Sequence, residues 1–302
     1  MSEPTDSAAP AREPYRADLL AEQHVLVTGG GTGLGAAMAA RFASLGAAVS
    51  ICGRRRGPID ATAAQISDAG GRCQAIPCDV RKSERVEALV DEAERRQGPV
   101  TRLLNNAAGN FLAFSHTLED KGFNAVVDIV LKGGFHATRA CGRRWIERGS
   151  GGGVLSITTT YAEGGSPYVL PSAMAKAGLV AMTRSLAIEW GGHAIRLNAI
   201  SPGPIPTKGA WERLIPGEGM EQTMRQSVPI GRFASKHELA SLASYLLSDE
   251  LSGAVNGQVI ELDGGASLNG GASFTQLMAL GDDALGEAFA RMRPRGGEPG
   301  AE

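Results

Sequence analysis

Short apolar segments alternate with longer segments of helical periodicity along most of the chain. The first apolar segment, residues 24–27, leads into a glycine-rich stretch. Leu34, Met38, Phe42 and Leu45 then recur at the spacing of one helix face, which predicts a helix over 33–45. Further apolar segments predict strands over 47–52, 73–78, 102–105, 154–158, 195–201 and 258–262.

Helical periodicity fills the intervals between these strands, over about 59–69, 83–96, 119–148, 172–190 and 236–248. This alternation predicts an α/β fold, with one doubly wound parallel sheet and helices on both of its faces. We expect a flexible tail over 1–18, a single domain over 19–266 and a C-terminal extension over 267–302. One amphipathic helix is predicted in that extension, near 274–292.

The composition is that of a globular protein. Of the 302 residues, 43% are hydrophobic and 21% are charged, and the net charge of -2 leaves no basic field to hold nucleic acid. No apolar run reaches the length of a membrane span, and no His or Cys spacing predicts a metal site. Four cysteines without a disulfide pattern, an acidic N-terminus and no peroxisomal tripeptide predict a cytoplasmic location.

The segment Thr28-Gly-Gly-Gly-Thr-Gly-Leu-Gly35 lies between the first predicted strand and the first predicted helix. Glycines at 29, 33 and 35 let the backbone turn tightly and approach a pyrophosphate, and the helix N-terminus attracts the anion. This context predicts a dinucleotide site with cofactor contacts from Gly29, Gly30, Gly31, Thr32, Gly33 and Leu34.

The end of the second strand decides which dinucleotide is favoured. The run Cys52-Gly53-Arg54-Arg55-Arg56 holds no carboxylate for a ribose diol, and arginine suits the 2′-phosphate of NADPH. The alternative is a solvated basic run at a helix start. Asp79 ends the third strand, where it can accept from the adenine amino group, and Asn106 follows the fourth, where the dinucleotide must pass.

These features together resemble the short-chain dehydrogenase/reductase family. The resemblance covers about 19–266 and rests on TGGGTGLG at 28–35, CDV at 78–80, NNAAG at 105–109, Lys176, SPGPI at 201–205 and LDGG at 262–265. It implies a seven-stranded Rossmann domain, often in a homotetramer. It also implies cofactor contacts from Lys176, on the nicotinamide ribose, and from Pro202, Gly203, Pro204 and Ile205.

One position departs from the pattern of most members of that family. They carry a catalytic tyrosine four residues before the lysine, and this chain has Ser172 there. A phenol is available at Tyr161, which follows the fifth strand, and Asn110 follows the fourth strand on the same edge. The chain is thereby similar to the NADPH-dependent 2,4-dienoyl-CoA reductases, through NNAAGNF at 105–111, DIVLKGGF at 128–135, SITTTYAEGGS at 156–166, PSAMAKAG at 171–178 and SPGPIPTKGAWERL at 201–214.

This second resemblance implies a reaction in the β-oxidation of unsaturated fatty acids. Tyr161 and Asn110 would bind the thioester oxygen while hydride reaches Cδ, which stabilises the dienolate as an oxyanion hole does. Protonation at Cα by water would give trans-3-enoyl-CoA. Ser172 would position the substrate or Tyr161.

Coenzyme A brings phosphates, for which Arg54, Arg81 and Arg213 are candidate partners, and Phe111 is expected to line the acyl slot. Each arginine could equally be an ordinary surface residue. A trans-2-enoyl-CoA reductase, a 3-oxoacyl reductase and a nucleotide-sensing protein without activity are the alternatives. Ser172 argues against a ketoreductase, as does Val130, which stands where the family commonly has an asparagine of its proton relay.

Overall fold

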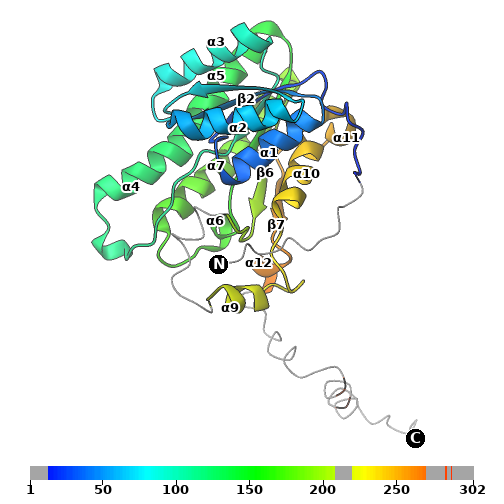
Figure 1. The fold of residues 1–302 in the computed structure, drawn as a ribbon. Coiled ribbons are helices and arrows are strands. Elements are labelled where there is room, and N and C mark those ends of the chain that lie inside the picture. Colours follow the sequence, from blue (N-terminus) through cyan, green and yellow to red (C-terminus); the bar gives the residue numbers. More distant parts are fainter. Residues whose placement is uncertain (1–12, 208–219, 270–282, 284–286, 288–302) are drawn as a thin grey trace, which may run out of the picture.

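The computed structural model describes residues 13–207 and 220–269 together with Asp283 and Glu287. Its centre is a seven-stranded parallel sheet in the order β3-β2-β1-β4-β5-β6-β7, which confirms the predicted fold class (Figure 1). The strands are β1 (His24–Thr28), β2 (Ala48–Gly53), β3 (Arg72–Pro77), β4 (Arg102–Asn105), β5 (Gly152–Ile157), β6 (Ile195–Pro202) and β7 (Val259–Leu262).

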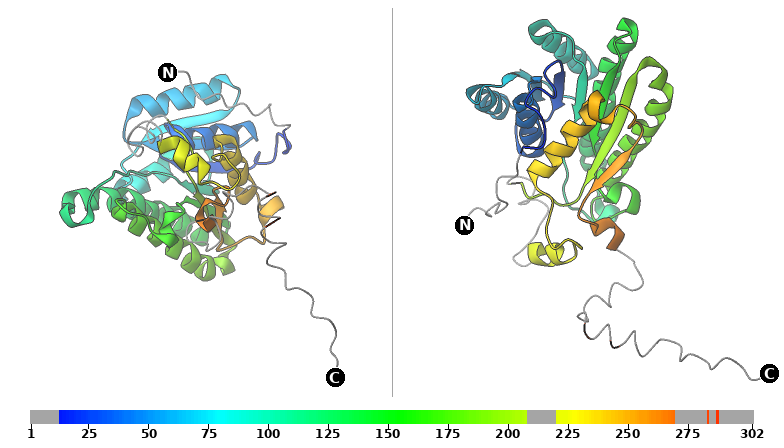
Figure 2. Two further views of the ribbon diagram at one scale, coloured as in Figure 1. Left: turned by 90° about the horizontal axis from the view of Figure 1, so that it is seen from below. Right: turned by 90° about the vertical axis from the view of Figure 1, so that its right-hand side faces the viewer.

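Helices cover both faces of the sheet (Figures 1 and 2). Alternate side chains of the central strands supply two separate cores, as in β1, where Val25 and Val27 face one side and Leu26 the other. The first core packs against α1 (Gly33–Ser44), α2 (Arg56–Asp68) and α10 (Lys236–Leu247). The second packs against α3 (Ser83–Gln97), α5 (Gly133–Arg148) and α7 (Leu170–Glu189).

The long helix predicted over 119–148 is divided by a turn of wider helix. It consists of α4 (Asp120–Val127), a π-helical turn at Asp128–Lys132, and α5. The short helix α6 (Tyr161–Gly164) was not predicted, because four residues show no periodicity. The remaining α-helices of the described ranges are α9 (Met220–Gln226), α11 (Asp249–Ser252) and α12 (Ala266–Asn269).

Part of the expected N-terminal tail contacts the domain. Glu13 forms an ion pair with Arg41 of α1, and the Tyr15 hydroxyl donates to the carbonyl of Ser241 at 3.2 Å. Residues 1–12 and nearly all of the helix predicted near 274–292 lie outside the described residues. None of the helices in the described ranges combines the length and the apolar character that a membrane span needs.

Candidate active site

The loop between β1 and α1 is closely packed on its inner side. Gly29 and Gly33 have left-handed backbone angles, φ +68° and +59°, which glycine adopts without strain. A Cβ added to Gly35 would lie 2.5 Å from Nδ2 of Asn106 and closer still to the carbonyl oxygen of Gly29. Larger residues at positions 29 and 35 would therefore distort the loop.

The same loop is open on its outer side. Among the described residues, a Cβ added to Gly33 would meet nothing nearer than the Thr207 side chain, at 3.8 Å. The first residues of α1 start here, so their unpaired N–H groups are available to an anion. An inner side without room and an outer side with N–H groups fit a dinucleotide pyrophosphate.

Asn106 holds this loop in place. Its Nδ2 donates to the carbonyl oxygens of Thr28 and Gly29 at 3.0 and 3.1 Å. The Thr28 hydroxyl in turn accepts from the backbone N–H groups of Asn106 and Ala107. Sequence reasoning assigned Asn106 to the cofactor and overlooked Thr28, although its place at the start of the glycine motif is a usable signal.

Three charged residues that were predicted to bind the cofactor or the substrate, Arg54, Asp79 and Arg81, lie just after the ends of β2 and β3. Arg54 is exposed, and Arg81 forms an ion pair with Asp79 in which Nε lies 2.9 Å from Oδ1 and Nη2 lies 2.5 Å from Oδ2. These bonds from Arg81, with a smaller contribution from the charge of Arg54, hold the pKa of Asp79 below its usual range. Arg213 lies outside the described residues.

The phenol of Tyr161 lies between two predicted partners. Nδ2 of Asn110 donates to the Tyr161 hydroxyl at 3.2 Å, and that hydroxyl is 3.1 Å from Oγ of Ser172. Oδ1 of Asn110 accepts from the backbone N–H of Phe111 at 2.9 Å, which directs the NH₂ group toward the phenol. Loops after β4 and β5 and the start of α7 thus meet at one hydroxyl group.

Lys176 lies one turn after Ser172 on the same face of α7, and both side chains are buried. Its ammonium group donates to the carbonyl of Ile157, the last residue of β5. Burial lowers the pKa of this amine to about 8. This partner was not predicted, since a backbone carbonyl leaves no signal in the sequence.

Three further predicted residues, Gly203, Ile205 and Phe111, lie in segments that follow β6 and β4. The N–H of Gly203 donates to the carbonyl of Leu262 at 3.1 Å, and a Cβ on Gly203 would lie 2.8 Å from Cβ of Asp263. Ile205 is buried in the first core. Phe111 packs against a small apolar cluster of α4, the π-helical turn and α7 that includes the buried Val130.

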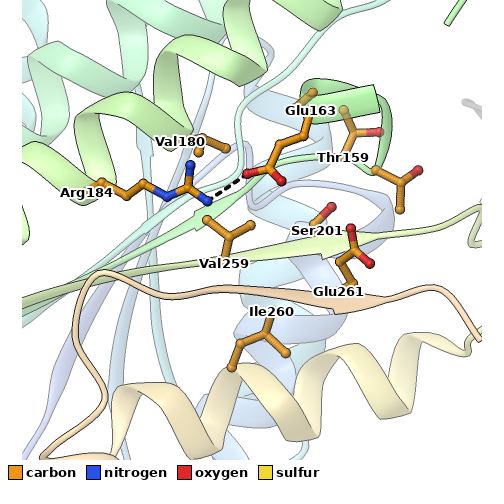
Figure 3. Close-up of a pocket in the computed structure, with 10 residues that line it drawn as sticks. Thr159, Glu163, Val180, Arg184, Ser201, Val259, Ile260 and Glu261 are labelled. Atoms are coloured by element: carbon orange, nitrogen blue, oxygen red, sulfur yellow. Dashed lines mark hydrogen bonds and ion pairs between the residues drawn. The ribbon is translucent and has the colours of Figure 1, made fainter. Parts of the chain in front are cut away.

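A separate pocket of about 440 Å³ lies beside this site (Figure 3). Glu163 of α6 and Arg184 of α7 form an ion pair of 2.8 Å in its wall. None of Asn110, Tyr161, Ser172 and Lys176 lines it. Its lining residues are Thr159, Thr160, Ala162, Glu163, Val180, Arg184, Ser201, Val259, Ile260 and Glu261.

Two curated relatives match most of the chain. A probable (3E)-enoyl-CoA-producing 2,4-dienoyl-CoA reductase of Caenorhabditis elegans is 44% identical over 245 residues, which are 80% of this chain and 79% of that protein. A probable (2E)-enoyl-CoA-producing 2,4-dienoyl-CoA reductase of Bacillus subtilis is 42% identical over 247 residues, 81% of this chain and 96% of that protein.

Solved structures agree with the fold. A short chain dehydrogenase from Bacillus anthracis has a TM-score of 0.74 at 39% identity and is covered to 96%, against 81% of this chain. A gluconate 5-dehydrogenase from Burkholderia cenocepacia, in complex with NADP and tartrate, has a TM-score of 0.78 at 28% identity, with 98% of it and 83% of this chain covered.

A family model described as Enoyl-(Acyl carrier protein) reductase matches residues 29–267. That range includes the glycine loop, Lys176 and every other predicted site residue, and it agrees with the resemblance drawn from the motifs. The chain is a member of the short-chain dehydrogenase/reductase family, in the branch whose relatives include proteins named 2,4-dienoyl-CoA reductase.

Proposed function

We propose that the protein reduces 2,4-dienoyl-CoA thioesters to trans-3-enoyl-CoA with NADPH, as a step in the β-oxidation of unsaturated fatty acids. One observation carries the proposal: the Tyr161 hydroxyl is bonded to Asn110 and Ser172, and no phenol stands four residues before Lys176. A donor pair away from the usual position suits a substrate whose charge develops far from the carbon that accepts hydride.

The side chains act on the thioester oxygen. NADPH would supply the hydride to Cδ, and the negative charge would then be shared by Cγ, Cα and that oxygen. The phenol O–H and the second N–H of Asn110 donate to the oxygen as this charge develops. Ser172 assists by donating to the phenol oxygen, which leaves the phenol proton free for the substrate. Water protonates Cα afterwards.

Lys176 is assigned to the nicotinamide ribose. Its bond to Ile157 uses one of three N–H donors, so two remain for ribose hydroxyls. The pair that Asp79 forms with Arg81 holds this carboxylate ionised at the end of β3, where it can accept from adenine.

NADPH rather than NADH is the proposed cofactor. Arg54 is exposed beyond the end of β2, and the strand end offers no carboxylate. Replacing Arg54 by Ala should weaken NADPH binding about tenfold, the size of a lost charge-assisted hydrogen bond. NADH, which has no 2′-phosphate, is the internal control and should bind both proteins alike in fluorescence titrations.

The activity is tested by following NADPH oxidation with hexa-2,4-dienoyl-CoA beside crotonyl-CoA and acetoacetyl-CoA. Turnover with the diene alone supports the proposal. Turnover with acetoacetyl-CoA and not with the diene would mean a ketoreductase with an unusual proton donor. Turnover with crotonyl-CoA would favour a trans-2-enoyl reductase, and binding of NADPH without any turnover would favour a sensing role.

Product identity requires its own measurement, because the two relatives are named for different products. Protonation at Cα by water yields the 3-enoyl product. A reaction in D₂O should therefore place deuterium at C2 and the double bond between C3 and C4. Deuterium at C4 with a double bond between C2 and C3 would contradict this assignment.

We further propose a homotetramer in the cytoplasm, with the coenzyme A phosphates bound by Arg54 and Arg81, and by Arg213 in the segment outside the described residues. The four cysteines, all free, support a reducing compartment. Light scattering tests the assembly, and imaging of the tagged full chain tests the location.

A further inference from the structure

Two segments beside the phenol, the loop after Asn110 and the chain that leads into the start of α7, expose large apolar side chains. Leu112 and Phe114 follow Asn110 and are 41% and 61% exposed, and Tyr168 and Leu170 precede Ser172 and are 50% and 41% exposed. We name these four residues the mouth patch. Contiguous exposed apolar surface on a protein is often a binding site, and here both parts of the patch lie within four residues of a proposed catalytic group.

The two segments are joined to each other. The N–H of Ala113 donates to the carbonyl of Tyr168 at 3.0 Å. The rings of Phe114 and Tyr168 pack edge to face, with centroids 5.6 Å apart. Tyr168 also has a left-handed backbone, φ +66°, which is uncommon for a bulky residue and costs free energy. Since half of this residue is exposed, packing in a core does not explain the strained position.

We propose that the mouth patch binds the hydrocarbon tail of the acyl substrate beyond its conjugated carbons, and that it makes the enzyme selective for medium and long chains. This inference rests on the proposed function. Four extended residues span at most about 13 Å, so the patch starts close to the position of the thioester. A six-carbon dienoyl chain has one carbon beyond Cδ and ends before the patch, whereas a ten-carbon chain has five and reaches it.

The sheet order separates this patch from the proposed site of the coenzyme A phosphates. Arg54 and Arg81 follow β2 and β3, whereas the patch belongs to the segments after β4 and β5, on the other side of β1. Three of the four patch side chains have no hydrogen-bonding group, so they offer little to the amides of pantetheine. The phosphate end of an acyl-CoA thus matches the charged end of this sheet edge, and its hydrocarbon end matches the apolar end.

The test compares hexa-2,4-dienoyl-CoA with deca-2,4-dienoyl-CoA at saturating NADPH. A fully buried methylene contributes up to about fourfold to binding, so partial burial of the tail should give the wild type at least about tenfold higher kcat/KM on the longer substrate. Phe114→Ala and Tyr168→Ala should each remove most of that preference and change kcat/KM on the shorter substrate less than about twofold. Phe114→Leu should retain it in part.

Ile188→Ala is the matched control, because Ile188 is 85% exposed on α7 and belongs to neither segment. Equal losses on both substrates, or no preference in the wild type, would overturn the proposal. A change of assembly state in Phe114→Ala, seen by light scattering, would identify the patch as a contact between copies of the chain and also overturn it.

Calorimetry with saturated hexanoyl- and decanoyl-CoA separates this inference from the proposed function. If no dienoyl-CoA is reduced, the proposed function fails. The patch still predicts tighter binding of decanoyl-CoA and loss of that difference in Phe114→Ala. Equal affinities for the two thioesters would reject the patch even in an active enzyme.

Discussion

The loop after β1 and the loops after β4 and β5 build neighbouring parts of one site by different means. The first, the proposed cofactor part, offers the unpaired N–H groups at the start of α1 and depends on Gly29 and Gly35, which leave no room for a Cβ. The second, the proposed catalytic part, presents side chains. Asn110, Tyr161 and Ser172 meet through hydrogen bonds, and Lys176, one turn after Ser172, donates to the carbonyl of Ile157.

This difference determines what a substitution does. In the cofactor part, an added methyl group displaces backbone and weakens binding. In the proposed catalytic part, removal of one polar atom is expected to leave the fold intact and to remove stabilisation of charge in the transition state. Affinity for NADPH and turnover should therefore respond separately to changes in the two parts.

The largest effect is expected for Tyr161→Phe. Loss of one donor to a developing oxyanion typically lowers kcat about 100- to 1,000-fold, while the affinity for NADPH should change less than about threefold, because the phenol is not expected to touch the cofactor. Stopped-flow and fluorescence titration measure the two quantities. Tyr245→Phe on α10 is the control, and turnover of Tyr161→Phe near that of the wild type would contradict the oxyanion role.

Gly35→Ala should give the opposite pattern. Its Cβ would enter the space of the Gly29 carbonyl and Asn106 Nδ2, and overpacking of this kind should raise the Kd for NADPH about tenfold or more. The kcat at saturating NADPH should fall much less. Gly57→Ala in α2 is the matched control, since no atom of the described ranges lies within 4 Å of a Cβ at this position. The affinity of this variant for NADPH should equal that of the wild type.

The same difference explains how far the sequence was informative. All seven strands were predicted within a few residues, because buried parallel strands and glycine loops are continuous in the sequence. The helices α2 and α7 start three and two residues before their predicted starts, and each has a proline in its first turn, Pro58 and Pro171. Proline is compatible with the first turn of a helix, where its missing N–H has no partner to lose.

Partners within the site were less predictable than positions. The motifs predicted that Asn106 and Arg81 follow the carboxyl ends of two strands, and they do. Their partners were not predicted: Asn106 donates to the glycine loop and Arg81 pairs with Asp79. Such choices depend on which groups the folded chain places within hydrogen-bond distance. The grouping of Asn110, Tyr161 and Ser172 could be predicted in part, because the family resemblance indicated it. Periodicity alone did not.

The pH dependence of NADPH binding tests the role of Lys176, which belongs to the catalytic part and is assigned to the cofactor. Lys176 is charged below its lowered pKa of about 8 and becomes neutral above it. The affinity for NADPH should therefore fall as the pH rises through 8, by up to about tenfold between pH 7 and 9 if only the cation binds well. Lys176→Arg stays charged over this range, so its affinity should be independent of pH. An unchanged Kd in the wild type would exclude this role of the ammonium charge.

The smallest effect concerns the ion pair between Glu163 and Arg184, which lies in the wall of the pocket of Figure 3. Tyr161 begins the four-residue helix α6, which is too short to be stable alone, and this pair ties α6 to α7. Both side chains are more than half exposed, so the pair should contribute only about two- to fivefold to kcat.

Neutralising each partner in turn distinguishes a structural role of this ion pair from an effect of its charges on the dienolate. If the pair holds Tyr161 in place, Glu163→Gln and Arg184→Gln should both lower kcat, and high salt should bring the wild type toward the variants. If only the local field acts on the dienolate, the two variants should change kcat in opposite directions, because one removes a negative and the other a positive charge. Glu92→Gln, in an exposed pair on α3, controls for general effects of losing a surface ion pair. A fall in both variants would show that the catalytic part, unlike the cofactor part, depends on an exposed contact outside the site itself.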